Sequence, residues 1–241
     1  MSLFAWIASA AASAAGGFIT AVCGFGLGPI MMSVMPYFMP YSRAVALVGI
    51  CGMAVNLMIA FAGRREINWK KLLPCVAGGL LSSIAAVSLS VGAAEKVMVR
   101  ALGAALIALS IYSVFFSGRL RIRSTPLNGM IAGIIAGTMT GLFSAGGPPI
   151  AIFMLASADN NDEYRSTLNA YFSIINVCAA VNRAFSGVLT PSDFWLFVQL
   201  LAALALGKWL GNKVFHRFDP NRLRKVVYAY LCVSGITMLL K

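Results

Sequence analysis

The chain consists largely of long apolar segments separated by short polar links. The segments fall at 3–23, 29–39, 43–62, 71–91, 96–116, 127–143, 148–157, 166–186, 193–213 and 222–240. Most contain about 20 residues, which at 1.5 Å per residue is enough to cross a hydrocarbon core of about 30 Å. With 60% hydrophobic and 11% charged residues, the chain has too few polar side chains to cover a water-facing surface. The sequence therefore predicts an all-α polytopic membrane protein.

Two segments are much shorter than the others, and each follows a glycine-rich break. Residues 17–30 read GFITAVCGFGLGPI and residues 137–150 read GTMTGLFSAGGPPI. At an offset of 120 they share five residues: Gly17/Gly137, Thr20/Thr140, Gly26/Gly146, Pro29/Pro149 and Ile30/Ile150. The segments that follow, 29–39 and 148–157, would reach only about 17 Å and 15 Å as helices. We expect broken or re-entrant half-helices, and the pattern leaves open whether they cross or turn back.

The charges in the links predict how the chain is threaded. Lys and Arg cluster in three links, at 63–71, 117–126 and 213–225, and are absent from two, at 92–95 and 187–192. Since basic links stay in the cytoplasm, both termini are expected outside the inner (cytoplasmic) membrane. Residues 1–120 and 121–241 would then be two repeats of about five segments with inverted topology, a plan that recurs among secondary transporters.

Each break has the composition of a loop that leads into a helix N-terminus. Glycine permits positive φ, and proline fits the first turn of a helix because the N–H it lacks would have no partner there. The free N–H groups and the positive dipole end of such a helix favour an anion. We expect the two breaks to meet near the membrane midplane and share one anion. The predicted binding residues are Thr20, Gly24, Gly26, Gly28, Pro29, Thr140, Ser144, Gly146, Gly147 and Pro148. Close helix packing is the alternative role for these glycines.

Four polar residues in or beside the apolar segments complete the predicted site. Asn56 and Asn176 lie within segments and should face protein or a cavity, because facing lipid is costly. Arg43 and Arg165 each follow a short segment, at near-equivalent places in the two halves, where a cation would attract an anion. Interhelical hydrogen bonding for the asparagines and lipid headgroup contact for the arginines remain open alternatives.

The sequence offers little for catalysis. It shows no nucleophile paired with a base, no nucleotide-binding loop and no metal-ligand cluster, and its five cysteines form no CxxC pair. We therefore predict no enzyme activity, no metal and no cofactor. The net charge of +12 follows membrane topology, so no nucleic-acid partner is expected; the expected partners are a small anion and the lipid bilayer. Residues 1–17 lack the basic start of a secretory signal and are expected to remain.

The two breaks and the segments around them resemble the TauE/SafE family of sulfite exporters. The resemblance extends over essentially the whole chain. It implies transport of a small sulfur-containing anion, such as sulfite, thiosulfate or an organosulfonate like sulfoacetate, across the cytoplasmic membrane, with export the commoner direction.

We therefore predict a secondary transporter that works by alternating access and holds its anion at two half-helix N-termini. An anion channel, or a membrane scaffold or assembly subunit in which the glycines only pack helices, are the alternatives. The substrate, direction, coupling ion and oligomeric state stay open, with a homodimer among the options.

Overall fold

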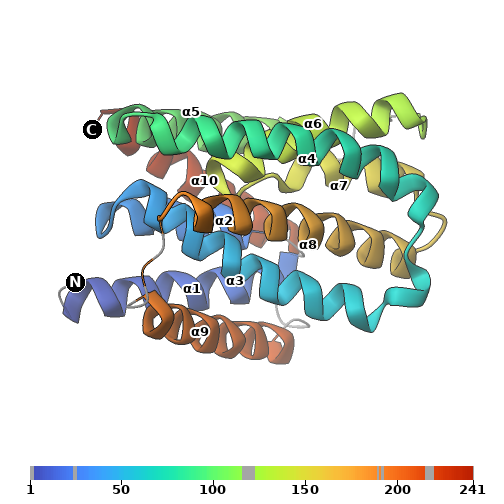
Figure 1. The fold of residues 1–241 in the computed structure, drawn as a ribbon. Helices are drawn as coiled ribbons and strands as arrows, with labels where there is room; N and C mark the ends of the chain where they lie inside the picture. The colour runs from blue at the N-terminus through green and yellow to red at the C-terminus, as the bar shows by residue number, and fades with distance from the viewer. Residues whose placement is uncertain are drawn as a thin grey trace. The chain divides into compact units, whose positions relative to one another are not determined.

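The computed structural model describes residues 3–23, 26–115, 123–188, 190, 193–214 and 220–240. Gly24, which belongs to the predicted site, and parts of the basic links 117–126 and 213–225 lie outside these residues. The described part contains helices and no strand (Figure 1), and this confirms the all-α prediction.

The helices follow the apolar segments closely. Ten α-helices and two short 3₁₀ turns are described: α1 (Leu3–Cys23), α2 (Leu27–Val34), η1 (Met35–Tyr37), α3 (Tyr41–Ala62), η2 (Arg64–Glu66), α4 (Trp69–Gly92), α5 (Glu95–Phe115), α6 (Pro126–Phe143), α7 (Gly147–Ser157), α8 (Asn161–Phe185), α9 (Asp193–Val214) and α10 (Pro220–Leu240). Five of the described helices, α1, α3, α4, α6 and α9, are long and apolar enough to cross a membrane.

The chain divides into two compact units, and these cut across the two halves of the sequence. Unit 1 consists of residues 1–48, 93–117 and 187–241, and unit 2 of residues 49–92 and 118–186. Unit 1 therefore contains α1, α2, α5, α9 and α10, and unit 2 contains α4, α6, α7 and α8, while α3 begins in unit 1 and ends in unit 2. Compactness does not test internal repetition, so the repeats at 1–120 and 121–241 stay a prediction.

Glycines let the helix backbones of unit 2 come close together. A Cβ at Gly133, Gly137 or Gly141 of α6 would meet the backbone of Cys75, Gly79 or Ser83 of α4, respectively. The contacts advance together along both helices, so α4 and α6 run in the same direction. Such small-residue contacts are typical of packing between membrane helices.

Unit 1 has the same kind of contact between α1 and α9 (Figure 1). The Ser13 hydroxyl donates to the Leu200 carbonyl at 2.7 Å. Farther along, a Cβ at Gly211 would meet the backbone of Phe18. These two helices are also parallel, and α1 and α9 correspond by the 120-residue offset to α6 and α4.

The short helix after each break turns back along the long helix before it. In unit 2, Gly146 lies against Ala136 of α6, and Phe153 near the middle of α7 lies against Gly129. In unit 1, Gly16 contacts Leu27 at the start of α2. The ring of Phe38, just beyond η1, packs edge-on against that of Phe4 with centroids 5.6 Å apart. Each break is therefore the tip of a helical hairpin.

The depth of the tips can be read from the neighbouring helices. Gly137 and Gly141 contact α4 at Gly79 and Ser83, about 15–21 Å along a helix of about 36 Å. Gly17 contacts Leu204, about 17 Å along the roughly 33 Å of α9. The start of α2 lies against Gly16, next to Gly17, and the start of α7 lies against Ala136, next to Gly137. Both short helices therefore begin near mid-length of a helix long enough to span a membrane.

Candidate functional site

The break in unit 2 is held in place by a left-handed residue and a close backbone approach. Ser144 ends α6 with φ 52°, and its N–H donates to the carbonyls of Met139 and Thr140. Gly146 then lies so close to the Ala136 carbonyl and the Thr140 hydroxyl that a Cβ could not fit. Glycine at 146 is required for packing, which is one of the two roles that the sequence allowed.

The start of α7 is open. A Cβ added at Gly147, the first residue of the helix, would meet no atom within 4 Å in the described part of the chain. No described side chain caps this helix, and Pro148 occupies its first turn without an N–H. The first N–H groups of a helix have no partner within it. The Gly147 N–H therefore has no partner within its helix, and no described atom lies where a side chain on this residue would begin.

A buried hydroxyl adds to this site. Thr140 is 2% exposed, and its Oγ1 has no hydrogen-bond partner among the described residues. The same atom lies against Gly146 at the start of α7. A buried polar atom without a partner costs about 1–3 kcal/mol, and a water or ligand outside the structure would remove this cost.

The break in unit 1 shares several of these features. Gly26 precedes α2 with φ 126°, a backbone conformation that strongly favours glycine, and no described side chain caps the helix. Gly28 and Pro29 are buried in its first turn. Thr20 again has a buried Oγ1 without a partner in the described chain. Both copies of the repeated threonine therefore place an unsatisfied hydroxyl beside a break.

The asparagines of the predicted site both belong to unit 2. Asn176 in α8 is 6% exposed, and Asn56 in α3 is half-buried. They are 120 residues apart, so they occupy matching positions of the repeated pattern. Their burial agrees with the expectation that neither faces lipid, and their role at the anion stays a prediction.

Arg43 is part of an ion pair at the starts of helices in unit 1. Its Nε donates to Asp193 Oδ1 at 2.5 Å, and its Nη2 contacts the same oxygen. The other oxygen, Asp193 Oδ2, accepts from the N–H and the hydroxyl of Thr190 at 2.8 and 2.9 Å. The pair fastens the start of α3 to the start of α9. The attraction of an anion by Arg43 stays a prediction. In the structure its guanidinium is paired with the Asp193 carboxylate.

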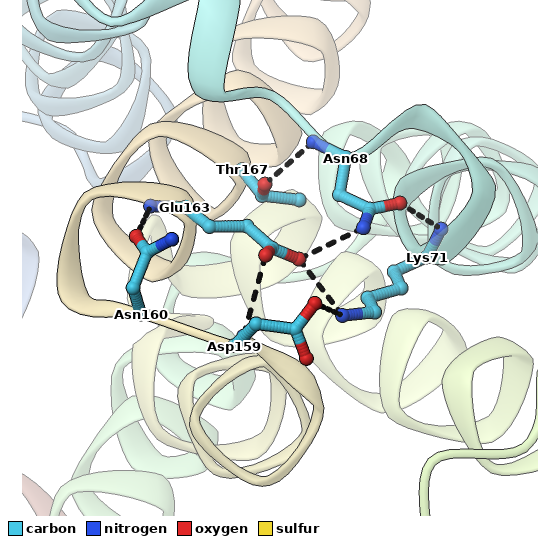
Figure 2. A network of polar contacts seen from close by, with 6 residues as sticks. All are labelled: Asn68, Lys71, Asp159, Asn160, Glu163 and Thr167. Carbon is cyan, nitrogen blue, oxygen red and sulfur yellow. Dashed lines mark hydrogen bonds and ion pairs between the residues drawn. The ribbon is translucent and has the colours of Figure 1, made fainter.

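Arg165 is exposed on α8, and the residue that corresponds to Arg43 at the 120-residue offset is Glu163. Glu163 is also ion-paired, with the charges reversed (Figure 2). Lys71 Nζ lies 2.9 Å from Glu163 Oε1 and 3.2 Å from Asp159 Oδ2. The Asn68 amide also donates to Glu163 Oε1, at 2.9 Å. This cluster fastens the start of α8 to the start of α4.

The electrostatics of the cluster favour an ionised Glu163. Burial raises the pKa of its carboxyl, but the hydrogen bonds from Lys71, the Asp159 backbone and Asn68 together lower the pKa below its usual range. The Glu163 N–H also donates to Asn160 Oδ1 at 2.8 Å, which caps α8 (Figure 2). The first turn of α8 is therefore firmly placed before its apolar segment begins.

The predicted site lacks one polar residue of α8, Arg183, which lies within an apolar segment of the sequence. The structure buries Arg183 almost completely, at 2% exposure, and its Nη2 donates to the carbonyl of Gly141 near the end of α6. A signal was available, since Asn169, Asn176 and Arg183 are spaced by seven residues and so share a face of α8.

Comparisons with known proteins agree with the architecture. The family model described as "Sulfite exporter TauE/SafE" matches residues 9–238. A relative from Cupriavidus necator, named a probable sulfite/organosulfonate exporter TauE, is 24% identical over 233 residues, covering 94% of this chain and 90% of its own. No solved structure matches the chain. The resemblance drawn from the two breaks is confirmed: the chain is a multi-pass membrane protein that belongs to the sulfite exporter TauE/SafE family.

Proposed function

We propose that this protein is a secondary transporter that exports a small sulfur-containing anion, such as sulfite, thiosulfate or an organosulfonate like sulfoacetate, across the cytoplasmic membrane. The family and the name of the Cupriavidus necator relative support this substrate class. The observation that carries the proposal is the pair of breaks, each with an uncapped helix start and a buried threonine hydroxyl without a described partner.

The chemistry of the breaks suits an oxyanion. Sulfite and sulfonates carry several acceptor oxygens and no strong donor, so they match a site built from donors. In our proposal the free N–H groups of the first turns of α2 and α7, with the hydroxyls of Thr20 and Thr140, hold the anion near mid-membrane. Each short helix directs its positive dipole end toward its break.

The mechanism that we propose is alternating access, in which two parts of the protein rock about the bound anion. The driving force is the membrane potential. An inside-negative potential expels an anion with about 2.3 kcal/mol per charge per 100 mV. With the basic links in the cytoplasm, both termini lie outside.

Counterflow in proteoliposomes tests the proposal. Vesicles loaded with unlabelled sulfite should accumulate labelled sulfite transiently, because a carrier exchanges across the membrane and a channel does not. Competition by thiosulfate, sulfoacetate, taurine and malonate would rank the affinities of these compounds for the transporter. Malonate is included as the carboxylate isostere of sulfoacetate. Equal leakage of all anions without saturation would indicate a channel, and no flux of any would support a scaffold.

The driving force can be tested with the same vesicles. A potassium-diffusion potential without a pH gradient should be enough to drive net sulfite movement, at a rate that rises with the potential. Transport that requires an imposed pH gradient would refute the potential-driven mechanism and leave the carrier intact.

A further inference from the structure

One helix of unit 2 turns a polar face toward the protein. Polar residues of α8 recur at intervals of three, four, three and seven positions, at Ser166, Asn169, Ser173, Asn176 and Arg183, so they form a single stripe. Four of the five are buried, at 2–6% exposure, while Asn169 is half-buried. A stripe of buried polar side chains is costly in a membrane protein and typically marks the path of a substrate or ion.

Arg183, at one end of this stripe, reaches the second break. Its Nη2 donates to Gly141, one residue beyond Thr140. Its Nη1 lies 3.6 Å from the position that a Cβ would take at Gly49, and Ser144 Oγ lies 3.3 Å from the same position. The guanidinium and the hydroxyl of Ser144 therefore converge on one backbone site in α3, beside the loop that leads to α7.

The surroundings of Gly141 include a second orphan hydroxyl. Ser83 of α4 packs against Gly141 through its backbone and is fully buried. Its Oγ, like that of Thr140, has no hydrogen-bond partner in the part of the chain that the structure describes. Two unsatisfied hydroxyls and a buried cation thus surround a single turn of α6. This combination indicates a polar ligand or ordered water in that place.

We propose that Arg183 is the charged ligand of the transported anion, and that the polar stripe of α8 lines its path to the second break. This inference rests on the proposed function and adds to it a substrate-binding residue. A guanidinium stays charged under all physiological conditions and its planar N–H groups match the oxygens of a sulfite or sulfonate group. A buried arginine supplies the long-range attraction that a helix dipole alone supplies only weakly.

The first half of the chain has no counterpart to this arginine. The residue 120 positions before Arg183 is Gly63. Charge recognition is therefore asymmetric: the second break holds the anion by full charge and the first by backbone dipoles and Thr20. The ion pair of Lys71 with Glu163 fixes the start of α8, and so fixes which way its polar stripe faces.

A purely structural role for Arg183 is the competing explanation, since a cation near the C-terminus of α6 also complements the helix dipole. The two roles differ in what they do to anion binding. A structural arginine affects the melting temperature without anion. A ligand affects the rise in melting temperature that an anion produces, and it affects the KM of transport.

The test compares R183Q and R183K with wild type and with R100Q, which removes an exposed arginine of α5. We expect R183Q to raise the KM for sulfite at least about tenfold and to abolish the sulfite-induced shift in melting temperature. R183K should restore part of both, and R100Q should match wild type. A folded R183Q with wild-type KM and an unchanged shift would overturn the inference, while wild-type transport would still support the proposed function.

A second variant keeps the arginine and covers the case in which R183Q does not fold. In G49A the added methyl group would lie 3.3 Å from Ser144 Oγ and 3.6 Å from Arg183 Nη1, so the Ser144 hydroxyl must shift by a few tenths of an ångström, while alanine favours the helix. We expect G49A to fold and to raise the KM for sulfite severalfold. A G49A protein with wild-type KM would also overturn the inference. If wild type itself moves no sulfur anion, the proposed function fails instead.

Discussion

The two breaks share a layout but differ in charge. Each joins a long and a short helix in a hairpin, leads into a short helix that begins near mid-depth, and has a buried threonine hydroxyl without a described partner. Among the described residues, a buried arginine, Arg183, lies beside the second break and none lies beside the first. The first depends on Gly26, which adopts φ 126°. The two breaks thus share a backbone layout and differ in the charge beside them.

The two ion pairs differ in a similar way. Arg43 with Asp193 in unit 1 and Glu163 with Lys71 in unit 2 each join the starts of two helices. Arg43 and Glu163 are 120 residues apart and have opposite charge. The contact is retained and its polarity reversed. Each pair therefore joins two helix starts, with opposite signs of charge at the matching residue.

Among the substitutions that test this comparison of the breaks, the largest loss of sulfite flux is expected at Gly147. A leucine there meets no described atom near its Cβ, so G147L should fold with nearly wild-type melting temperature and lose at least about 90% of sulfite flux by filling the space before α7. G146L, whose side chain collides with Ala136 and Thr140, should lose stability by about 1–3 kcal/mol as well. Sulfite flux in proteoliposomes and thermal melting in detergent distinguish loss of transport from loss of stability.

G92L is the matched control for these variants. Gly92 ends α4, and a Cβ there also meets no atom within 4 Å. The variant should transport as wild type does. Normal transport by G147L would show that the space before α7 does not bind the anion. If this variant also lost binding to a protein partner, the scaffold alternative would gain support.

Substitution of the two threonines is expected to raise the KM for sulfite by an intermediate amount, and by more at Thr140 than at Thr20. Valine has nearly the shape of threonine without the hydroxyl, so T140V and T20V each remove one hydrogen bond to the anion and should not destabilise the protein, because neither hydroxyl has a described partner. We expect KM for sulfite to rise about threefold to tenfold in T140V and less in T20V, since Arg183 concentrates binding at the second break.

Thermal melting without anion is the control for this pair. Both variants should melt at or above the wild-type temperature, because each removes a buried, unsatisfied polar atom. A clear loss of stability in T140V would mean that the hydroxyl has a structural partner. Equal changes in KM would remove the asymmetry between the breaks.

The smallest effect is expected from E163Q, which tests the ion pair of unit 2. The carboxyl of Glu163 has a lowered pKa in the folded protein, so its contribution is present above the unfolded pKa and is lost as pH falls through the folded pKa. E163Q should lower stability by about 1–2 kcal/mol at neutral pH and by less in acid. Melting curves between pH 3 and pH 7 would show the two proteins converge; a constant difference would contradict the assignment.

The bounds of most helices were predictable from the lengths of the apolar segments. A membrane helix must satisfy its backbone internally, so helices such as α6 and α9 begin and end where the apolar run does. The short helices were also predicted, because glycine and proline mark helix ends in a single sequence. The pairing of α1 with α9 and of α4 with α6 was not predicted, since segment lengths do not say which neighbours pack together.

The candidate site was predicted in outline and missed in one residue. The breaks, Thr140 and Asn176 followed from the repeat and from burial. Arg183 was not among the predicted residues, because the position of a polar residue within a segment does not reveal which direction its side chain faces. Its heptad spacing from Asn176 was informative, and its contacts near Gly141 and Gly49 in the structure connect it to the break. Arg165 was placed by analogy with Arg43, whereas the structural counterpart of Arg43 is Glu163.

The central claim is that the anion binds at the start of α7, beside Thr140 and Arg183. Crystals of the full chain grown with selenite, an analogue of sulfite whose selenium scatters anomalously, test this most directly. We predict an anomalous peak within hydrogen-bonding reach of the Gly147 N–H and Thr140 Oγ1, which is lost in R183Q. A peak elsewhere, or none at this break at selenite concentrations that inhibit sulfite transport, would contradict it.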